Sequence, residues 1–286
     1  SVVEEKKIWI PSKNITVKSL SERLKRIFES KNPKTKLVAY FVGCHPNYKT
    51  SLELIKRSID SGVSVIELGY CTSEASAEGP IIKAAHDRCL KNKVSLKDNV
   101  KLAKEIRKYN DKVGIIHMGY IANLYMYPIT KFVEDIAKAE SDGVLVVDAP
   151  HELKEENILR EKLNSYNLSL IKLVAPTTPD ARLKLIANLA SGFIYCVNVK
   201  GITGVKRALQ SDVSKMIKKI KSVTSIPVCS GFGIKTPKDA KMISKTGCNG
   251  IVVGTTIVSY IEKNLKNKNL PQKIGKLVRS FSKELN

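Results

Sequence analysis

Short apolar runs rich in valine and isoleucine recur along the chain at even spacing, and longer segments with helical periodicity separate them. Their apolar character is continuous, without polar alternation, which is typical of strands buried on both faces of a parallel sheet. Eight runs have this character: residues 37–43, 64–68, 114–118, 144–148, 170–174, 193–197, 226–230 and 250–254.

Helical segments lie between these runs, among them residues 96–110, 180–190, 211–223 and 236–246. Ser95 is placed to cap the first of them, and Asp98 supplies an acid in its first turn. Eight strands, each followed by a helix, predict the α/β class and a (β/α)8 TIM barrel. An open doubly wound sheet is the competing architecture, but no glycine fingerprint follows the first run.

The start of the chain carries one further helical stretch, SLSERLKRIFES, ahead of the first run. We expect residues 1–35 to form an extension whose helix closes the barrel floor, and residues 36–286 to form the barrel. No linker divides the chain further.

The chain has 286 residues, of which 43% are hydrophobic, enough for a core of its own. No apolar run reaches the roughly 18 to 20 residues of a membrane-crossing helix, so we expect no membrane partner.

The start, SVVEEKKIWI, has charges where a signal peptide is apolar. Six cysteines without C-x-x-C spacing predict free thiols and no metal site. These features favour a cytoplasmic protein, with the plastid as the alternative.

The net charge is +22, from 49 Lys and Arg against 27 Asp and Glu. Most of the basic residues are lysines, and they are spread over nearly every helical segment. Sequence-specific nucleic-acid binding favours arginine clustered on one face. We therefore predict a solvated lysine-rich surface and no nucleic-acid partner, although a positive field would speed the capture of phosphorylated substrates.

Glycine-bearing loops follow the last three predicted strands, at residues 201–204, 230–234 and 254–256. Glycine lets backbone N–H groups approach an anion, and a short helix starting near Thr255 would add the positive end of its dipole. Barrels commonly bind phosphate with the loops after strands seven and eight. The pattern predicts a phosphate site there, with tight turns that bind no ligand as the alternative.

Several polar side chains stand at predicted strand ends. Glu67 ends the second run, where an inward-facing position should raise its pKa and suit acid–base catalysis; an ion pair with a lysine is the alternative. Glu78, in the next loop, fits a solvated acid when taken alone, as does Glu74. Asp148 fits a catalytic, a loop-capping or an interface role. Tyr195 would either pack in the core or contact an aromatic substrate.

Taken together, these segments resemble the tryptophan synthase alpha chain family, from about residue 37 to residue 261. The matching motifs are Ala39-Tyr40…Pro46, Ile66-Glu67-Leu68-Gly69, Ala77-Glu78-Gly79-Pro80, Asp142-Gly143-Val144…Asp148-Ala149-Pro150, Ala175-Pro176-Thr177-Thr178-Pro179-Asp180, Gly201-Ile202-Thr203-Gly204, Gly231-Phe232-Gly233-Ile234 and Gly250-Ile251-Val252-Val253-Gly254-Thr255. Each motif is weak alone, and their number, order and loop placement make the match specific.

The resemblance implies a lyase of tryptophan biosynthesis that cleaves indole-3-glycerol phosphate to indole and glyceraldehyde 3-phosphate, beside a beta chain that consumes the indole. It implies no cofactor for this half-reaction, since pyridoxal phosphate belongs to the beta chain. Glu67 matches the acid–base residue that protonates indole C3, Glu78 the second acid at the indole N–H, and Tyr195 the aromatic residue near the reacting centre. The matching phosphate-binding positions are Gly204, Gly233, Gly254 and Thr255. We further expect Tyr40, Tyr120 and Phe232 to line the substrate pocket.

The chain departs from the family pattern near the second acid. Glu78 stands where Asp is usual, and Cys71-Thr72-Ser73-Glu74-Ala75 replaces the usual Pro-Phe-Ser-Asp-Pro. In the third-strand loop either Ala122 takes the place of a typical Asn, or Asn123 does so one step out of register. Two alternatives therefore remain: a weakly active or non-catalytic alpha-like subunit that activates a beta chain, and another phosphate-binding barrel enzyme.

Overall fold

The predicted apolar runs form one closed parallel sheet in the computed structural model, which describes residues 21–197 and 207–286. The strands are β1 (Lys36–Val42), β2 (Val65–Gly69), β3 (Gly114–Gly119), β4 (Gly143–Val146), β5 (Ser169–Leu170), β6 (Lys172–Val174), β7 (Ile194–Val197), β8 (Val228–Gly231) and β9 (Gly250–Val253). Their order is β5-β4-β3-β2-β1-β9-β8-β7-β6. Only Ile171 separates the two end strands in the chain, so the sheet closes and the predicted barrel is confirmed.

Most strands match their predicted ranges to within one or two residues, and two of the differences have a clear physical cause. The fifth run is divided at Ile171, because β5 pairs with β4 whereas β6 pairs with β7. There the Leu170 N–H donates to Ser191 Oγ, at 2.8 Å. β8 begins at Val228, two residues later than predicted, because Pro227 has no N–H to donate to a neighbouring strand.

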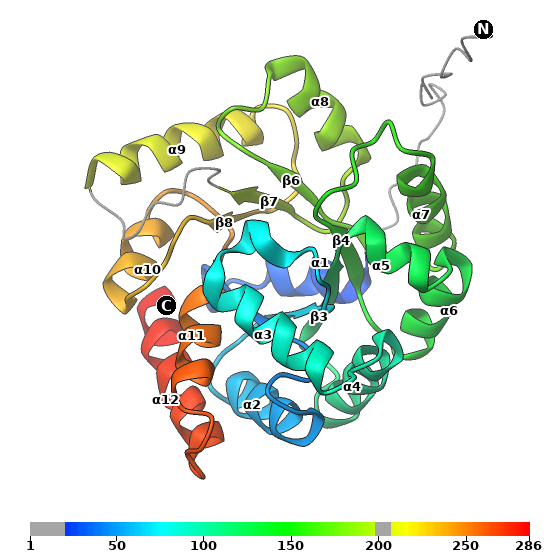
Figure 1. Cartoon of the computed structure of the whole chain (residues 1–286). Helices are drawn as coiled ribbons and strands as arrows, with labels where there is room; N and C mark the ends of the chain where they lie inside the picture. The colour runs from blue at the N-terminus through cyan, green and yellow to red at the C-terminus, as the bar shows by residue number, and fades with distance from the viewer. Residues whose placement is uncertain (1–20, 198–206) are drawn as a thin grey trace, which may run out of the picture.

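Helices lie outside the sheet, and most of them surround the strands in a ring (Figure 1). They are α1 (Glu22–Glu29), α2 (Tyr48–Asp60), α3 (Pro80–Lys91), α4 (Leu96–Tyr109), α5 (Ile121–Met126), α6 (Ile129–Lys138), α7 (Lys154–Ser165), α8 (Asp180–Leu189), α9 (Arg207–Lys221), α10 (Pro237–Ser244), α11 (Thr255–Lys263) and α12 (Leu270–Ser282), with the 3₁₀ turns η1 (Ala75–Glu78) and η2 (Lys283–Leu285). The predicted cap of α4 is present as a capping box between Ser95 and Asp98.

Helix α1 lies across the amino-terminal end of the barrel (Figure 1). Its Leu24 is 1% exposed and belongs to the same buried cluster as Val65 and Ile116, and the Phe28 ring lies 5.6 Å from that of Phe193. Asp142 holds the start of the helix, because it accepts a hydrogen bond from Ser21 Oγ at 2.6 Å. The amino-terminal end of the barrel is therefore closed, and the carboxyl-terminal end of the strands is the open end where a functional site can lie. The division of the chain at residue 35 stays a prediction.

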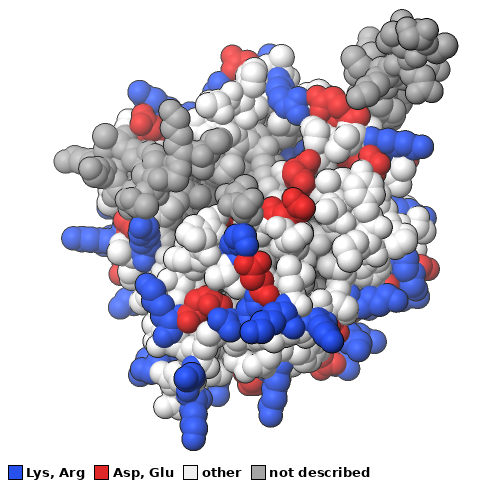
Figure 2. Space-filling model, in the orientation of Figure 1, with Lys and Arg blue, Asp and Glu red and all other residues white. Residues whose placement is uncertain are grey.

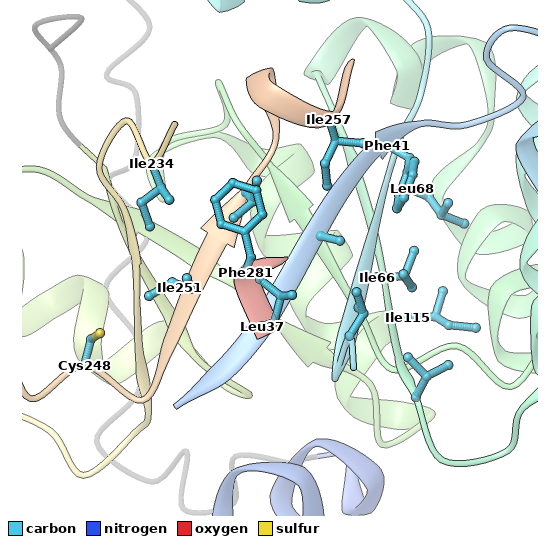
Figure 3. Packing of buried hydrophobic residues seen from close by; sticks show 14 of the residues in the cluster. Leu37, Phe41, Ile66, Leu68, Ile115, Ile234, Cys248, Ile251, Ile257 and Phe281 are labelled. Atoms are coloured by element: carbon cyan, nitrogen blue, oxygen red, sulfur yellow. The ribbon is translucent and has the colours of Figure 1, made fainter. Parts of the chain in front are cut away.

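The larger core lies between the strands and the helices. Leu37, Phe41, Ile66 and Leu68 are buried there beside Phe281 of α12, as Figure 3 shows. All six cysteines are buried free thiols, as predicted.

Charged side chains cover the outside. On the face drawn in Figure 2, lysines and arginines are spread over the outline and interspersed with acidic residues. Within residues 21–197 and 207–286, no helix is long and apolar enough to cross a membrane.

Candidate active site

A cavity of about 780 Å³ opens at the mouth of the barrel, where the strands end. Its volume falls in the range of about 300–1,000 Å³ that is common for small-molecule sites. Residues from β1, β2, β7, β8 and β9 line it, together with α3 and α11. Seven of the predicted site residues line it: Tyr40, Glu67, Glu78, Tyr195, Gly233, Gly254 and Thr255.

Glu67 is the most deeply buried acid of this cavity, with 1% of its surface exposed. Burial raises the pKa of its carboxyl from 4.5 to about 8, as the sequence predicts for an inward-facing position. Its Oε1 has no hydrogen-bond partner within the described parts of the chain. A buried carboxyl with a free oxygen and a pKa close to neutrality can both give and take a proton.

Glu78 ends the short turn η1, on the same cavity, so the structure brings it together with Glu67. Tyr40 donates a long hydrogen bond of 3.5 Å from its hydroxyl to Glu78 Oε1. The Nε2 atom of His86, on α3, lies 3.3 Å from Glu78 Oε2. Glu78 is therefore a partly buried acid held among polar neighbours and not a solvated loop residue.

Two tyrosines frame the cavity on opposite sides of β9. Burial, and secondarily the charge of Glu78, raises the pKa of the Tyr40 phenol. Burial, and secondarily the charge of Glu67, raises the pKa of the Tyr195 phenol. Both phenols therefore stay protonated at neutral pH and offer O–H donors and apolar ring faces to a ligand.

The far end of the cavity has backbone features that favour the binding of an anion. Helix α11 begins at Thr255 after Gly254, and no side chain caps its first N–H groups. Gly233 lines the same end with a φ of +23°, a backbone conformation that favours glycine. Thr256 Oγ1 donates to the Ile234 carbonyl at 3.0 Å and ties the two loops together. An uncapped helix start beside glycine backbone is a site for phosphate.

Lys235 and Lys263 also line the cavity and were not predicted as site residues, Lys235 just after the Gly233 loop and Lys263 at the last turn of α11. The backbone of Lys235 is fixed because its N–H donates to Asp239 Oδ2 at 3.0 Å, beside the capping box of α10. Lysine ammonium groups at an anion site add attraction to the helix dipole. In a chain with so many lysines, no sequence signal separates these two from the rest.

The family model for the tryptophan synthase alpha chain matches residues 28–285. The chain belongs to the tryptophan synthase alpha chain family.

Solved structures agree with this membership. The tryptophan synthase alpha subunit from Legionella pneumophila str. Paris is 26% identical, with a TM-score of 0.83 over 92% of this chain and 98% of that one. A structure from Aquifex aeolicus VF5 is 27% identical, with a TM-score of 0.81 over 92% and 99%. Tryptophan synthase from M. tuberculosis, in an aminoacrylate-bound form, is 22% identical with a TM-score of 0.80 over 92% and 99%, and shares the fold.

The reaction of the tryptophan synthase alpha chain family is that of a carbon–carbon lyase. It cleaves indole-3-glycerol phosphate to indole and glyceraldehyde 3-phosphate in tryptophan biosynthesis. The cavity contains an acid of raised pKa, Glu67, and the uncapped start of α11.

Two expected pocket residues differ from the sequence prediction, and one expected phosphate position is outside the described residues. Phe232 does not line the cavity: it is 4% exposed and belongs to the core cluster, because it follows the last residue of β8, Gly231, which lines the cavity, and successive side chains point in opposite directions. Tyr120 lines a small adjoining cavity instead, although its phenol lies near Glu78, which together with burial raises its pKa. Gly204 lies outside the described residues.

Two other sequence alternatives are resolved by contacts. Asp148 Oδ1 accepts the Ile121 N–H at 2.7 Å, so it caps α5, which is the loop-capping role. Asn123 is 5% exposed, and its Nδ2 donates to the Cys71 carbonyl at 3.3 Å. Asn123, rather than Ala122, therefore joins the third-strand loop to the second-strand loop.

Sequence reasoning missed His86 entirely. It is 1% exposed, on the apolar face of α3 with Ile82 and Cys89. A lone polar residue at a helical core position was the available signal, since a buried imidazole needs a partner.

Proposed function

We propose that this chain cleaves indole-3-glycerol phosphate with Glu67 as the acid–base residue, Glu78 as the second acid and the start of α11 as the phosphate site. The observation that supports this most is Glu67 itself, a carboxyl 1% exposed, with a pKa raised to about 8, on the cavity that Gly254 and Thr255 also line. At neutral pH most of Glu67 is protonated, so it is poised to act first as an acid.

The carbon–carbon bond can break only after indole loses its aromaticity. Glu67 donates its proton to indole C3, which leaves a positive charge on the indole nitrogen. Glu78, as a carboxylate near the N–H, stabilises that charge. The ionised Glu67 then takes the proton of the hydroxyl on the carbon attached to C3. The C3–carbon bond breaks, its electron pair returns to the ring, and indole and the aldehyde of glyceraldehyde 3-phosphate are formed.

The phosphate anchors the other end of the substrate. Backbone N–H groups at Gly254 and Thr255, with Gly233 close by, supply donors, and Lys235 supplies charge. Tyr195 and Tyr40 would lie against the indole and the glycerol chain. No step in this scheme requires a metal or an organic cofactor.

A beta chain is the partner that we propose, and pyridoxal phosphate belongs to that chain. Tyr125 and Met126 of α5 are 70% and 78% exposed and follow the carboxyl end of β3, on the side of the mouth. Adjacent large apolar side chains left in water support a protein partner. Sedimentation of the purified chain with a tryptophan synthase beta chain tests this, with Tyr125→Ser/Met126→Ser weakening the complex.

The experiment for the reaction is an assay of indole and glyceraldehyde 3-phosphate from indole-3-glycerol phosphate, with and without a beta chain. Equal amounts of both products from the chain alone are expected. Product formation that needs the beta chain but not Glu67 would support the alternative of a non-catalytic subunit. Turnover of other phosphosugars in preference to this substrate would support another barrel enzyme.

A further inference from the structure

We propose that His86 is a positioning residue that orients the carboxylate of Glu78, a role that rests on the proposed function of Glu78 as second acid. The two residues lie eight positions apart, on either side of the turn from η1 into α3.

The hydrogen bond on one side of the imidazole fixes its tautomer. The Thr72 N–H donates to His86 Nδ1 at 3.1 Å, so Nδ1 is an acceptor and carries no proton in the neutral ring. The ring proton is therefore on Nε2. Since Thr72 belongs to the loop that leads from β2 to Glu78, this bond also joins α3 to that loop.

The protonated side of the imidazole faces Glu78. His86 Nε2 lies 3.3 Å from Glu78 Oε2, and in the described residues neither atom has a well-formed hydrogen bond to any group. Two buried polar atoms so close, neither of which has a hydrogen bond to a described group, require only a small rotation to form one. Catalytic hydrogen bonds are commonly loose in a ligand-free site and tighten when substrate binds.

Contacts to α11 and to the loop after β1 hold α3, the helix that carries His86, in place. Two residues further along α3, Arg88 donates to both oxygens of Glu262 on α11, at 3.0 and 3.1 Å. The same Glu262 lies 2.6 Å from His45 Nε2, in the loop after β1. These contacts join α3 to α11, the helix whose start is the proposed phosphate site.

A long acid needs such a contact more than a short one. Glu78 has one methylene more than the Asp usual in the family, hence one more rotatable bond and a higher entropy cost for holding a single geometry. A fixed donor at Oε2 and the Tyr40 hydroxyl at Oε1, with the Tyr120 phenol close by, together select one rotamer. Held in this way, the carboxylate is already oriented when the charge on the indole nitrogen develops.

Two substitutions separate the contacts of the imidazole. In His86→Asn the amide replaces Nδ1 and keeps the acceptor for Thr72, but nothing reaches Glu78. In His86→Gln the longer amide replaces Nε2 and keeps the donor for Glu78, but Thr72 loses its acceptor. If His86 positions Glu78, His86→Asn lowers kcat about tenfold or more with KM nearly unchanged, whereas His86→Gln keeps kcat within about threefold and has the lower Tm of the two.

A double-mutant cycle shows whether the effect passes through Glu78. In a Glu78→Gln background, His86→Asn should produce no further loss of kcat. Full additivity of the two losses, or a His86→Asn variant with wild-type kcat, would overturn the proposal.

Nitrogen NMR of the imidazole tests the contact without any turnover. We expect the Nε2–H tautomer for His86 in the wild-type chain, with a resonance that shifts in Glu78→Gln but not in Glu74→Gln. An Nδ1–H tautomer, or no response to Glu78→Gln, contradicts the proposal. If the chain releases no indole, the proposed function fails, and this measurement still decides the role of His86.

Discussion

The ring of Tyr195 lies directly on the backbone of Gly231. A Cβ added to Gly231 would meet Cε2 of Tyr195 at 2.4 Å. Tyr195 is on β7, and Gly231 stands on β8, two residues beyond its register partner Cys229. The same relationship occurs between Tyr40 of β1 and Gly69 of β2, where a Cβ would meet the phenol oxygen at 2.4 Å. In both cases a missing side chain at the mouth makes room for a phenol of the cavity.

Gly231→Ala should therefore displace Tyr195 and lower kcat/KM about tenfold or more, since a misplacement near 1 Å can cost up to about a hundredfold. Gly275→Ala in α12 is the control, because its Cβ would meet Ser61 Oγ at 3.3 Å and no group of the cavity. Steady-state kinetics and Tm of both variants provide the measurement. Equal kcat/KM in Gly231→Ala and the wild type would show that Tyr195 does not need its present position.

Glu78→Gln should lower kcat about a hundredfold, because the amide cannot balance the positive charge on the indole nitrogen. Glu74→Gln alters a carboxyl of the same loop that is exposed and should leave kcat unchanged. Indole release at saturating substrate measures both. Matching kcat values for the two variants would remove Glu78 from the mechanism.

Lys235→Met should weaken the binding of glyceraldehyde 3-phosphate and inorganic phosphate about threefold to tenfold, since an exposed ammonium near a phosphate contributes about 1 kcal/mol. Lys238→Met, in α10 but away from the cavity, is the matched loss of charge. Titration calorimetry at low and high salt separates the local effect from the general field, because added salt should reduce the Lys235 effect. An effect of the same size from Lys238 would mean that only net charge matters.

The raised pKa of Glu67 makes the stability of the protein depend on pH. Between pH 4.5 and about 8 the folded chain keeps a proton on Glu67 that the unfolded chain has released. This contribution is complete below pH 4.5 and is lost as the pH rises through about 8, so the free energy of unfolding falls over that window.

Glu67→Gln has no such proton to lose. Urea unfolding should be measured at pH 5 and at pH 9 for the variant and the wild type. Between the two pH values the free energy of unfolding of the variant should rise relative to that of the wild type by a few kcal/mol, since one pKa unit corresponds to about 1.4 kcal/mol. A stability difference that does not change with pH would mean that the pKa of Glu67 is near 4.5.

Much of this site was predictable because its signals are local. Glu67 ends a buried run, and Gly254-Thr255 starts a helix with no capping side chain, so position along the chain was enough for both. The sequence does not assign one role to Asp148, because an acid at a strand end can serve several. Its contact with the Ile121 N–H identifies the loop-capping role.

The rest depends on geometry that the sequence does not display. The distance from Tyr195 to Gly231 follows from strand register, which only the closed barrel fixes. Phe232 was misplaced because one residue beyond a strand end changes the direction of the side chain. His86 meets Glu78 because α3 turns back over η1.

The central claim is that Glu67 moves the proton that allows the carbon–carbon bond to break. Single-turnover release of indole by Glu67→Gln, with binding of glyceraldehyde 3-phosphate measured on the same preparation, tests it most directly. We expect release to fall by at least about a thousandfold, within the range for loss of an acid–base group, while the phosphate ligand binds as in the wild type. Indole release at the wild-type rate by a variant that still binds the ligand would contradict the claim.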